Sequence, residues 1–184
     1  NHKPITGQFK AAITNDSFIF DKSELRYGNA IVKAEGGLTK TWNLNWNISI
    51  PNFNELTPEA SGRFITTGII QGKKYTPFIH AKIDATNLHI FEKNINALTG
   101  NIDLNLAPQG ESKININANN IEFGKTNLKN LSIKSTGISN ANTTQIVMTT
   151  DKAILQMELQ GGFDNKVWKG FISQFQINPL KTTP

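Results

Sequence analysis

The chain of 184 residues contains no cysteine. It therefore has no disulfides, no thiolate nucleophile and none of the common structural zinc sites. Arginine is scarce, since it occurs only at Arg26 and Arg63, and the remaining positive charge comes from lysines that stand singly among Asn, Thr and Gln. A sequence-specific reader of nucleic acid uses arginine forks and clustered basic residues. The net charge of +5 therefore indicates scattered solubilising charge and no nucleic-acid partner.

Long apolar runs and helical periodicity are also missing. No segment approaches the about 20 apolar residues that a membrane helix needs, and the opening stretch NHKPITGQF lacks the apolar centre of a signal peptide. The best candidate for a helical turn is NFNELTPEASG, where Pro58 and Gly62 confine it. Both ends read as cuts through a longer chain. We therefore expect residues 1–184 to be a single domain and a fragment of a longer protein.

Strict alternation of apolar and polar residues is what the sequence does contain. In WNLNWNISIP, residues 42–51, the apolar side chains fall on one face and Asn and Ser on the other, as in a strand with one dry and one wet surface. The same period returns in FIHAKIDA, NIDLNLA, KININAN, QIVMT and LQMELQGGF. Turn signals separate these blocks, among them EGG at 35–37, QGKKYTP at 71–77, APQGES at 107–112, SNANT at 139–143 and DNK at 164–166. This pattern predicts an all-β protein with antiparallel strands.

The dry face of these strands needs a partner, and three arrangements remain open. The strands could form two facing sheets with a filled core, close into a barrel, or curl into a trough whose apolar inside is partly uncovered. Small residues stand at inward positions, such as Gly68, Ala81, Ala85, Gly161 and Gly170. Glycine within a strand marks a bend or leaves room, so strong curvature is expected. In the last hairpin, Phe163 and Trp168 should return to the dry side.

Catalytic and metal-binding patterns are not evident. His2, His80 and His89 are too few and too scattered for a metal cluster. Asp84, Asp103 and Glu122 are out of phase with the apolar residues of their strands, so they should face solvent instead of forming a catalytic pair. No G-x-S-x-G or P-loop motif occurs. We expect a protein that is not an enzyme and has no catalytic residues, metal or cofactor.

The order of several motifs resembles a known family. The stretch LTPEASGRFITTGIIQGKKYTPFIHAKIDATNLHI, with Leu56, Pro58, Gly62, Gly68, Gly72, Pro77, Ala81, Ala85 and Leu88, is similar to a recurring line in the C-terminal part of TamB proteins. These are translocation and assembly module subunits, of the AsmA-like, bridge-like lipid transport group. NANNIEFGKTNLKNLSIKSTG at 117–137 and LQGGFDNKVWKGFISQFQI at 159–177 continue the likeness. A departure is GISNANTTQIVM, where Asn140 and Thr143 stand in place of the family's His.

The resemblance implies a β-taco, a long antiparallel sheet curled into a U-shaped groove with an apolar inside. It further implies a periplasmic protein, held in the inner membrane by a segment outside this fragment, that carries phospholipid acyl chains to the outer membrane of Gram-negative bacteria. Support of outer-membrane biogenesis and autotransporter assembly, with an outer-membrane barrel partner of the TamA kind, belongs to the same picture. The residues expected to line the groove are Trp42, Leu44, Trp46, Ile48, Ile50, Ile83, Ile102, Leu104, Ile114, Ile116, Leu155, Met157 and Leu159.

A different binding role is the alternative. The chain could serve as a chaperone or scaffold that offers a free strand edge to outer-membrane β-barrel or autotransporter clients by β-augmentation. Charge placed in a groove would stop lipid passage and spare edge pairing, whereas proline on the edge strand would do the reverse. A plain β-sandwich with a filled core is the third reading, and it would carry no lipid.

Overall fold

The computed structural model describes residues 4–124, 126–164 and 167–180. In these ranges the regular structure consists of thirteen strands in one sheet and a 3-10 turn, η1, at Phe53–Glu55. The strands are β1 Ile5–Gln8, β2 Ala11–Ile13, β3 Phe18–Tyr27, β4 Ala30–Leu38, β5 Thr41–Ile50, β6 Ala60–Lys73, β7 Thr76–Ile90, β8 Lys93–Asn105, β9 Ser112–Phe123, β10 Thr126–Ile138, β11 Ala141–Thr149, β12 Ala153–Asp164 and β13 Val167–Pro179.

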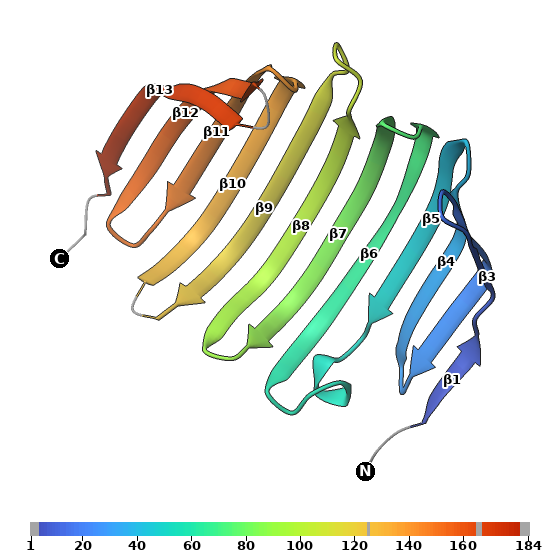
Figure 1. The fold of residues 1–184 in the computed structure, drawn as a ribbon. Helices are drawn as coiled ribbons and strands as arrows, with labels where there is room; N and C mark the ends of the chain where they lie inside the picture. The colour runs from blue at the N-terminus through green and yellow to red at the C-terminus, as the bar shows by residue number, and fades with distance from the viewer. Residues whose placement is uncertain (1–3, 125, 165–166, 181–184) are drawn as a thin grey trace.

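The strands follow one another through the sheet in sequence order, and all pairs are antiparallel. The order is β1-β3-β4 and onward to β13, while β2 pairs with β3 beside β1. Figure 1 shows this row as one curved sheet that runs from the N-terminal to the C-terminal end. Among the described residues, β1 and β13 do not pair with each other, so the sheet curls without closing into a barrel. The predicted antiparallel, curled architecture is confirmed.

Local sequence explains most of the connections. The chain turns at 74–75, 106–111 and 139–140, as the segments QGKKYTP, APQGES and SNANT predict. The turn predicted from EGG is wrong, because Gly36 and Gly37 lie inside β4. A Cβ at Gly36 would lie 1.8 Å from the Asn43 carbonyl oxygen, and one at Gly37 would lie 2.0 Å from the Phe18 oxygen. These glycines permit close approach of the neighbouring strands instead of reversing the chain.

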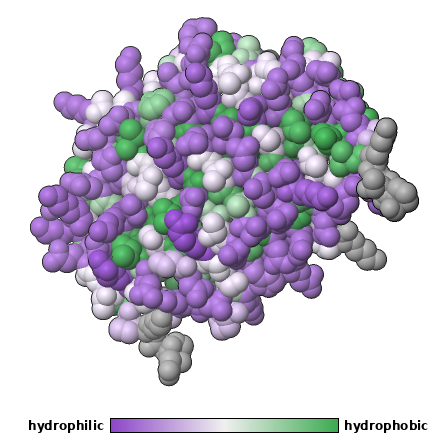
Figure 2. All heavy atoms as spheres, turned by 180° about the vertical axis from the view of Figure 1, so that it is seen from behind, coloured by the Kyte–Doolittle hydropathy of each residue, from purple (hydrophilic) through white to green (hydrophobic). Residues whose placement is uncertain are grey.

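Among the residues that the structure describes, no second layer covers the sheet. In the described residues no large side chain is fully buried, and the buried apolar residues are small or stand near strand ends: Ala30, Leu38, Ala60, Ala81, Ala85, Leu88 and Ala118. A sandwich of this length would bury large aliphatic and aromatic side chains in its centre. The described strands therefore do not form a filled sandwich. Figure 2, which views the molecule from behind, shows a surface of mostly hydrophilic side chains with smaller apolar patches.

Candidate functional site

One face of the sheet, here called the inner face, carries apolar side chains in rows that cross the strands. The strand register defines the rows, because residues paired in an antiparallel sheet point to the same side. One row runs through Ile48, Thr66, Ile83, Gly100, Ile116, Ile133, Ile146, Met157 and Phe175. A second runs through Ile50, Phe64, Ala85, Leu98, Ala118, Leu131, Met148, Leu155 and Ile177. The result is a largely apolar groove that runs from β5 to β13.

All residues predicted to line a groove lie on this inner face. A third row contains Trp46, Gly68, Ala81, Ile102, Ile114, Ser135, Thr144, Leu159 and Ile172, and a fourth contains Leu44, Ile70, Ile79 and Leu104. Trp42 stands opposite Leu38 and Gly72, next to the fourth row. The register thus brings together every predicted position from Trp42 to Leu159. The list of groove residues predicted from the sequence lacks members from β6, β10, β11 and β13, where the rows are extended by Phe64, Leu131, Ile146 and Phe175.

Glycines on the inner face make room for indole rings. A Cβ at Gly68 would lie 2.1 Å from Cζ2 of Trp46, its cross-strand partner. Near the other end of the sheet, a Cβ at Gly170 would lie 2.3 Å from Cη2 of Trp168, and one at Gly161 would lie 2.8 Å from Cζ2 of the same ring. Each indole therefore lies across the backbone of a glycine, where a side chain would clash with the ring.

Aromatic side chains line the N-terminal end of the groove. The rings of Phe9, Phe20, Phe18 and Trp42 form a series with centroid separations of 5.8, 5.7 and 5.6 Å. The last two contacts are edge-to-face, an arrangement that aromatic quadrupoles favour. The Trp42 indole N–H donates to the Lys74 carbonyl oxygen over 3.0 Å, so its polar atom is satisfied at the rim while its rings stay in the groove.

The C-terminal end of the sheet curls over the groove. Phe163 and Trp168, which pair across β12 and β13, line a cavity of about 390 Å³ together with Leu104 of β8 and Ile114 of β9. In a flat sheet β8 and β12 would lie about 19 Å apart, so sharing one cavity requires strong curling, which Figure 1 shows at the β12–β13 end. Both aromatics are on the dry side, as predicted, although they are 57% and 41% exposed. Residues 165–166 of the predicted turn lie outside the described residues.

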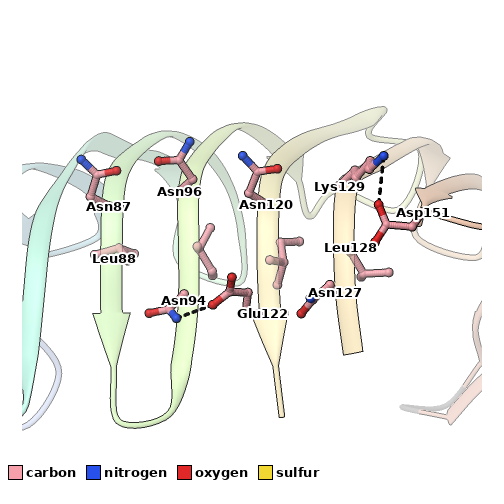
Figure 3. A pocket seen from close by; sticks show the side chains of 12 residues that line it. Asn87, Leu88, Asn94, Asn96, Asn120, Glu122, Asn127, Leu128, Lys129 and Asp151 are labelled. Carbon is pink, nitrogen blue, oxygen red and sulfur yellow. Dashed lines mark hydrogen bonds and ion pairs between the residues drawn. The ribbon is translucent and has the colours of Figure 1, made fainter. Parts of the chain in front are cut away.

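A kink across four strands changes which residues face inward. Asn87 and Asn120 have positive φ angles of 50° and 48°, and the backbone pairing skips them, so alternation shifts by one residue. As a result Leu88 is buried although it stands an odd number of residues from buried Ala85. Figure 3 shows Asn87, Asn96 and Asn120 aligned where these strands bend, beside the Lys129–Asp151 ion pair. Asparagine tolerates this left-handed conformation better than most residues, but nothing in an alternating pattern announces the shift.

The opposite, outer face carries paired polar groups. Arg63 is paired with Asp84, and the ring of His80 with Asp103. His89 is hydrogen-bonded to Asn94, which in turn donates to Glu122. Asp84, Asp103 and Glu122 therefore each have a different polar neighbour on the outer face, as expected from their positions in the strands. His2 lies outside the described residues.

Two outer-face carboxyl groups are held in the ionised form by hydrogen bonds. Lys33 and Arg26 lower the pKa of Glu24 below its ordinary value. Hydrogen bonds from Gln145, Ser173 and Gln160 lower the pKa of Glu158 in the same direction. Both groups are stabilised by neighbours on the exposed surface and not by burial, which is the pattern of structural pairs and not of a catalytic acid.

The described residues bring together no group of three or more His, Cys, Asp or Glu side chains that could hold a metal ion. They also include no helix long and apolar enough to cross a membrane. What the geometry offers is a long, largely apolar inner face. The outer face carries the paired polar groups together with some apolar side chains, such as Ile65, Ile69 and Phe78.

An open, curled antiparallel sheet with an apolar inner face defines a groove-forming β protein. The family model for the N-terminal domain of TamB matches residues 4–182, and the chain therefore belongs to the TamB family. This is the family that the sequence motifs indicated. The motifs were expected to lie in the C-terminal part of TamB proteins, and this expectation is wrong, because the matching family model is that of the N-terminal domain.

Two relatives extend this finding. The chain is 25% identical over 181 residues to the translocation and assembly module subunit TamB of Haemophilus influenzae. This alignment covers 95% of the chain and 14% of the Haemophilus protein. It is 28% identical over 147 residues to an uncharacterized protein of Buchnera aphidicola. This alignment covers 77% of the chain and 15% of the Buchnera protein. The chain thus spans about one seventh of the length of these relatives. No solved structure matches it.

Proposed function

We propose that the inner face is one segment of a groove that carries phospholipid acyl chains between the inner and outer membranes, in the periplasm of a Gram-negative bacterium. The single observation that supports this proposal most is the largely apolar inner face on a sheet that no second layer covers within the described residues. The whole protein would be held in the inner membrane by a segment outside residues 1–184. It would work with an outer-membrane barrel partner of the TamA kind and support outer-membrane biogenesis, including autotransporter assembly.

The energetics favour such a groove over free diffusion. Moving both tails of a phospholipid into water costs about 0.8 kcal/mol per methylene, or roughly 20 kcal/mol for the pair. The rows run from β5 to β13, a path of about 40 Å along the curved sheet at the usual strand spacing. Methylenes present nothing to hydrogen-bond, so the apolar rows would select weakly among acyl chains. Headgroups would stay in water at the opening, and no catalytic step is required.

A charge in the groove tests the proposal. Ile116 lies on the inner face between Gly100 and Ile133, and its neighbour Asn115 is exposed on the outer face. Ile116→Lys in the full-length protein should stop delivery of labelled phospholipid to the outer membrane, because a cation beside acyl chains costs several kcal/mol unless water enters. Leu104→Asp should act in the same way.

Asn115→Lys is the matched control, since it adds the same charge on the same strand and should leave delivery unchanged. Equal delivery by Ile116→Lys, Asn115→Lys and the parent, with the fold intact, would contradict the proposal.

The alternative, edge pairing with an unfolded barrel client, has one observation in its favour. β13 is the last strand of the described sheet, and its Phe171, Ile172, Phe175 and Ile177 are each more than half exposed. The Leu180 N–H donates to the Lys152 oxygen, so alternation of hydrogen bonds aims the N–H groups of Ile177 and Phe175 away from β12. Pro179 stands at a position of the same kind, as proline on an edge strand should.

Proline substitution at the edge separates the two functions. Ile177→Pro removes an outward N–H, whereas Ile177→Ala shortens the side chain and keeps it. If client capture is the role of this strand, Ile177→Pro should lose crosslinks to an unfolded autotransporter barrel and Ile177→Ala should keep them. Retention of crosslinks by both variants would remove this alternative.

A further inference from the structure

The cavity under the β12–β13 end differs from the rest of the groove. Elsewhere the inner rows carry apolar side chains with few exceptions, whereas this cavity also contains Ser112, Ser135, Asn142 and Thr144. Its apolar lining comes from Leu104, Leu106, Ile114, Ile138, Phe163 and Trp168. Ser112 and Asn142 both stand in register with Gly137 of β10, one on each side. On the inner face, the polar side chains of Ser112 and Asn142 therefore lie on either side of a glycine, which has no side chain to separate them.

The polar groups form a partly satisfied network. The Ser135 and Thr144 hydroxyl oxygens are 2.8 Å apart, and the Thr144 hydroxyl donates to Asn142 Oδ1 over 3.5 Å. Ser112 Oγ accepts from the Asn105 backbone N–H over 3.0 Å. Within the described residues, the Ser112 hydroxyl hydrogen and the Asn142 amide hydrogens have no protein acceptor. Ser112 and Asn142 thus offer hydrogen-bond donors to the cavity, while their own oxygen atoms each already accept a hydrogen bond.

The chemistry of the missing partner follows from what lines the cavity. No Lys, Arg or His is among its lining residues, so a phosphate or carboxylate would find no counter-charge. A neutral acceptor without hydrogens of its own, set between apolar chains, fits the donors. The ester carbonyls of a glycerolipid have this character: each accepts hydrogen bonds and continues into an acyl chain.

We propose that this cavity is a station for the ester-linked glycerol region of a lipid, with Ser112 and Asn142 donating to ester carbonyls. Ser135 and Thr144 hold the Asn142 side chain in place. The acyl chains leave the cavity along Ile114 and Leu104 toward the central rows, under Phe163 and Trp168. This inference rests on the proposed function, because it assumes that acyl chains enter the groove.

Tryptophan quenching by brominated lipid tests the station. Bromine quenches indole fluorescence on close contact. Trp46 of β5 and Trp168 of β13 both lie on the inner face, eight strand spacings apart, roughly 40 Å along the sheet. Within residues 1–184, Trp42→Phe with Trp46→Phe leaves Trp168 as the only tryptophan, and Trp42→Phe with Trp168→Phe leaves Trp46. The probes are phosphatidylcholines dibrominated either close to the ester or near the terminal methyl.

The station predicts that bromines close to the ester quench Trp168 more than terminal bromines do. Combining Ser112→Ala with Asn142→Val should remove this preference and weaken binding of the ester-proximal probe about tenfold, as expected for the loss of two neutral hydrogen bonds. Asn115→Val, an exposed outer-face change, should leave both properties as in the parent.

The outcomes separate the station from the groove. Quenching of both reporters without any dependence on bromine position overturns the station and leaves acyl-chain binding in place. A positional preference that survives the Ser112→Ala, Asn142→Val change also overturns it. Absence of quenching at both Trp46 and Trp168 by every probe overturns the proposed function, and the station with it.

Discussion

Adding a single methyl group at Gly68 should displace Trp46 from the sheet. The Cβ of Gly68→Ala would stand 2.1 Å from Cζ2 of Trp46 and 2.5 Å from the His80 carbonyl oxygen. Neither atom can yield cheaply, since one belongs to a rigid ring and the other to the backbone of β7. Gly100, an inner-face glycine of β8, provides the matched case, because its Cβ would lie 3.4 Å from Cβ of Ile83, within ordinary contact.

Two opposing contributions determine the change in the free energy of unfolding. Overpacking costs about 1–3 kcal/mol, and replacing glycine by alanine returns about 0.4–1 kcal/mol through the unfolded chain. We therefore expect Gly68→Ala to lower the free energy of unfolding by about 1–2 kcal/mol. Gly100→Ala meets no clash and should leave it unchanged or raise it by up to about 1 kcal/mol.

Urea unfolding followed by far-UV circular dichroism measures both changes, and equal slopes with denaturant confirm that only stability differs. Tryptophan emission of Gly68→Ala should also shift, because the Trp46 ring has to leave its place on β6. If Gly68→Ala is as stable as Gly100→Ala, the indole does not lie across the glycine backbone and the description of the groove floor is wrong.

Three further predictions concern the kink and the outer face. Asn120→Val should lose about 1–2 kcal/mol in urea unfolding because a β-branched residue resists positive φ, and Asn120→Gly should lose nothing; equal stability of the two variants would refute the kink. Arg63→Gln breaks the exposed pair with Asp84 and should cost less than about 1 kcal/mol in the same assay, so a larger loss would show that the pair is structural. The pKa of Glu158 should lie below 4.5 in an NMR titration and rise in Gln145→Leu, since the Gln145 hydrogen bond is the largest cause of the lowering. Because the folded pKa is the lower one, the stabilisation is present above about pH 4.5 and is lost as the pH falls through the folded pKa; an unchanged pKa in Gln145→Leu would contradict the assignment.

Much of the groove was predictable because side-chain direction in a strand has a period of two. From Trp42 to Ile50, and again around Ile102 and Ile116, alternation alone identifies the inner residues, and hairpin spacing predicts the antiparallel order. The absence of a helical period excluded a covering helix. Once no second layer is available, the dry face can only curl, close or pair, and the inward glycines indicated curling.

Other features depend on three-dimensional arrangement that alternation does not encode. The left-handed backbone at Asn87 and Asn120 shifts the alternation by one residue. Leu88 and Ile121 therefore point to the inner face, whereas strict alternation along the strand predicts the outer face. Gly36 and Gly37 have the composition of a turn, yet they lie in β4 because close strand approach needs the same residue. The polar cavity escaped prediction because Ser112 and Asn142 come together only through the register of three strands.

Site-specific photocrosslinking is the most direct test of the claim that the inner face contacts acyl chains. A photoreactive amino acid is placed at inward positions and at their outward neighbours on the same strands, and labelled phospholipid is supplied to the full-length protein. The position pairs are Ile48 with Asn47, Ile116 with Asn115, and Leu155 with Gln156. The account predicts capture of lipid from the inward member of every pair and not from the outward one. Equal capture from both members, or no capture from either in a folded protein, would contradict it.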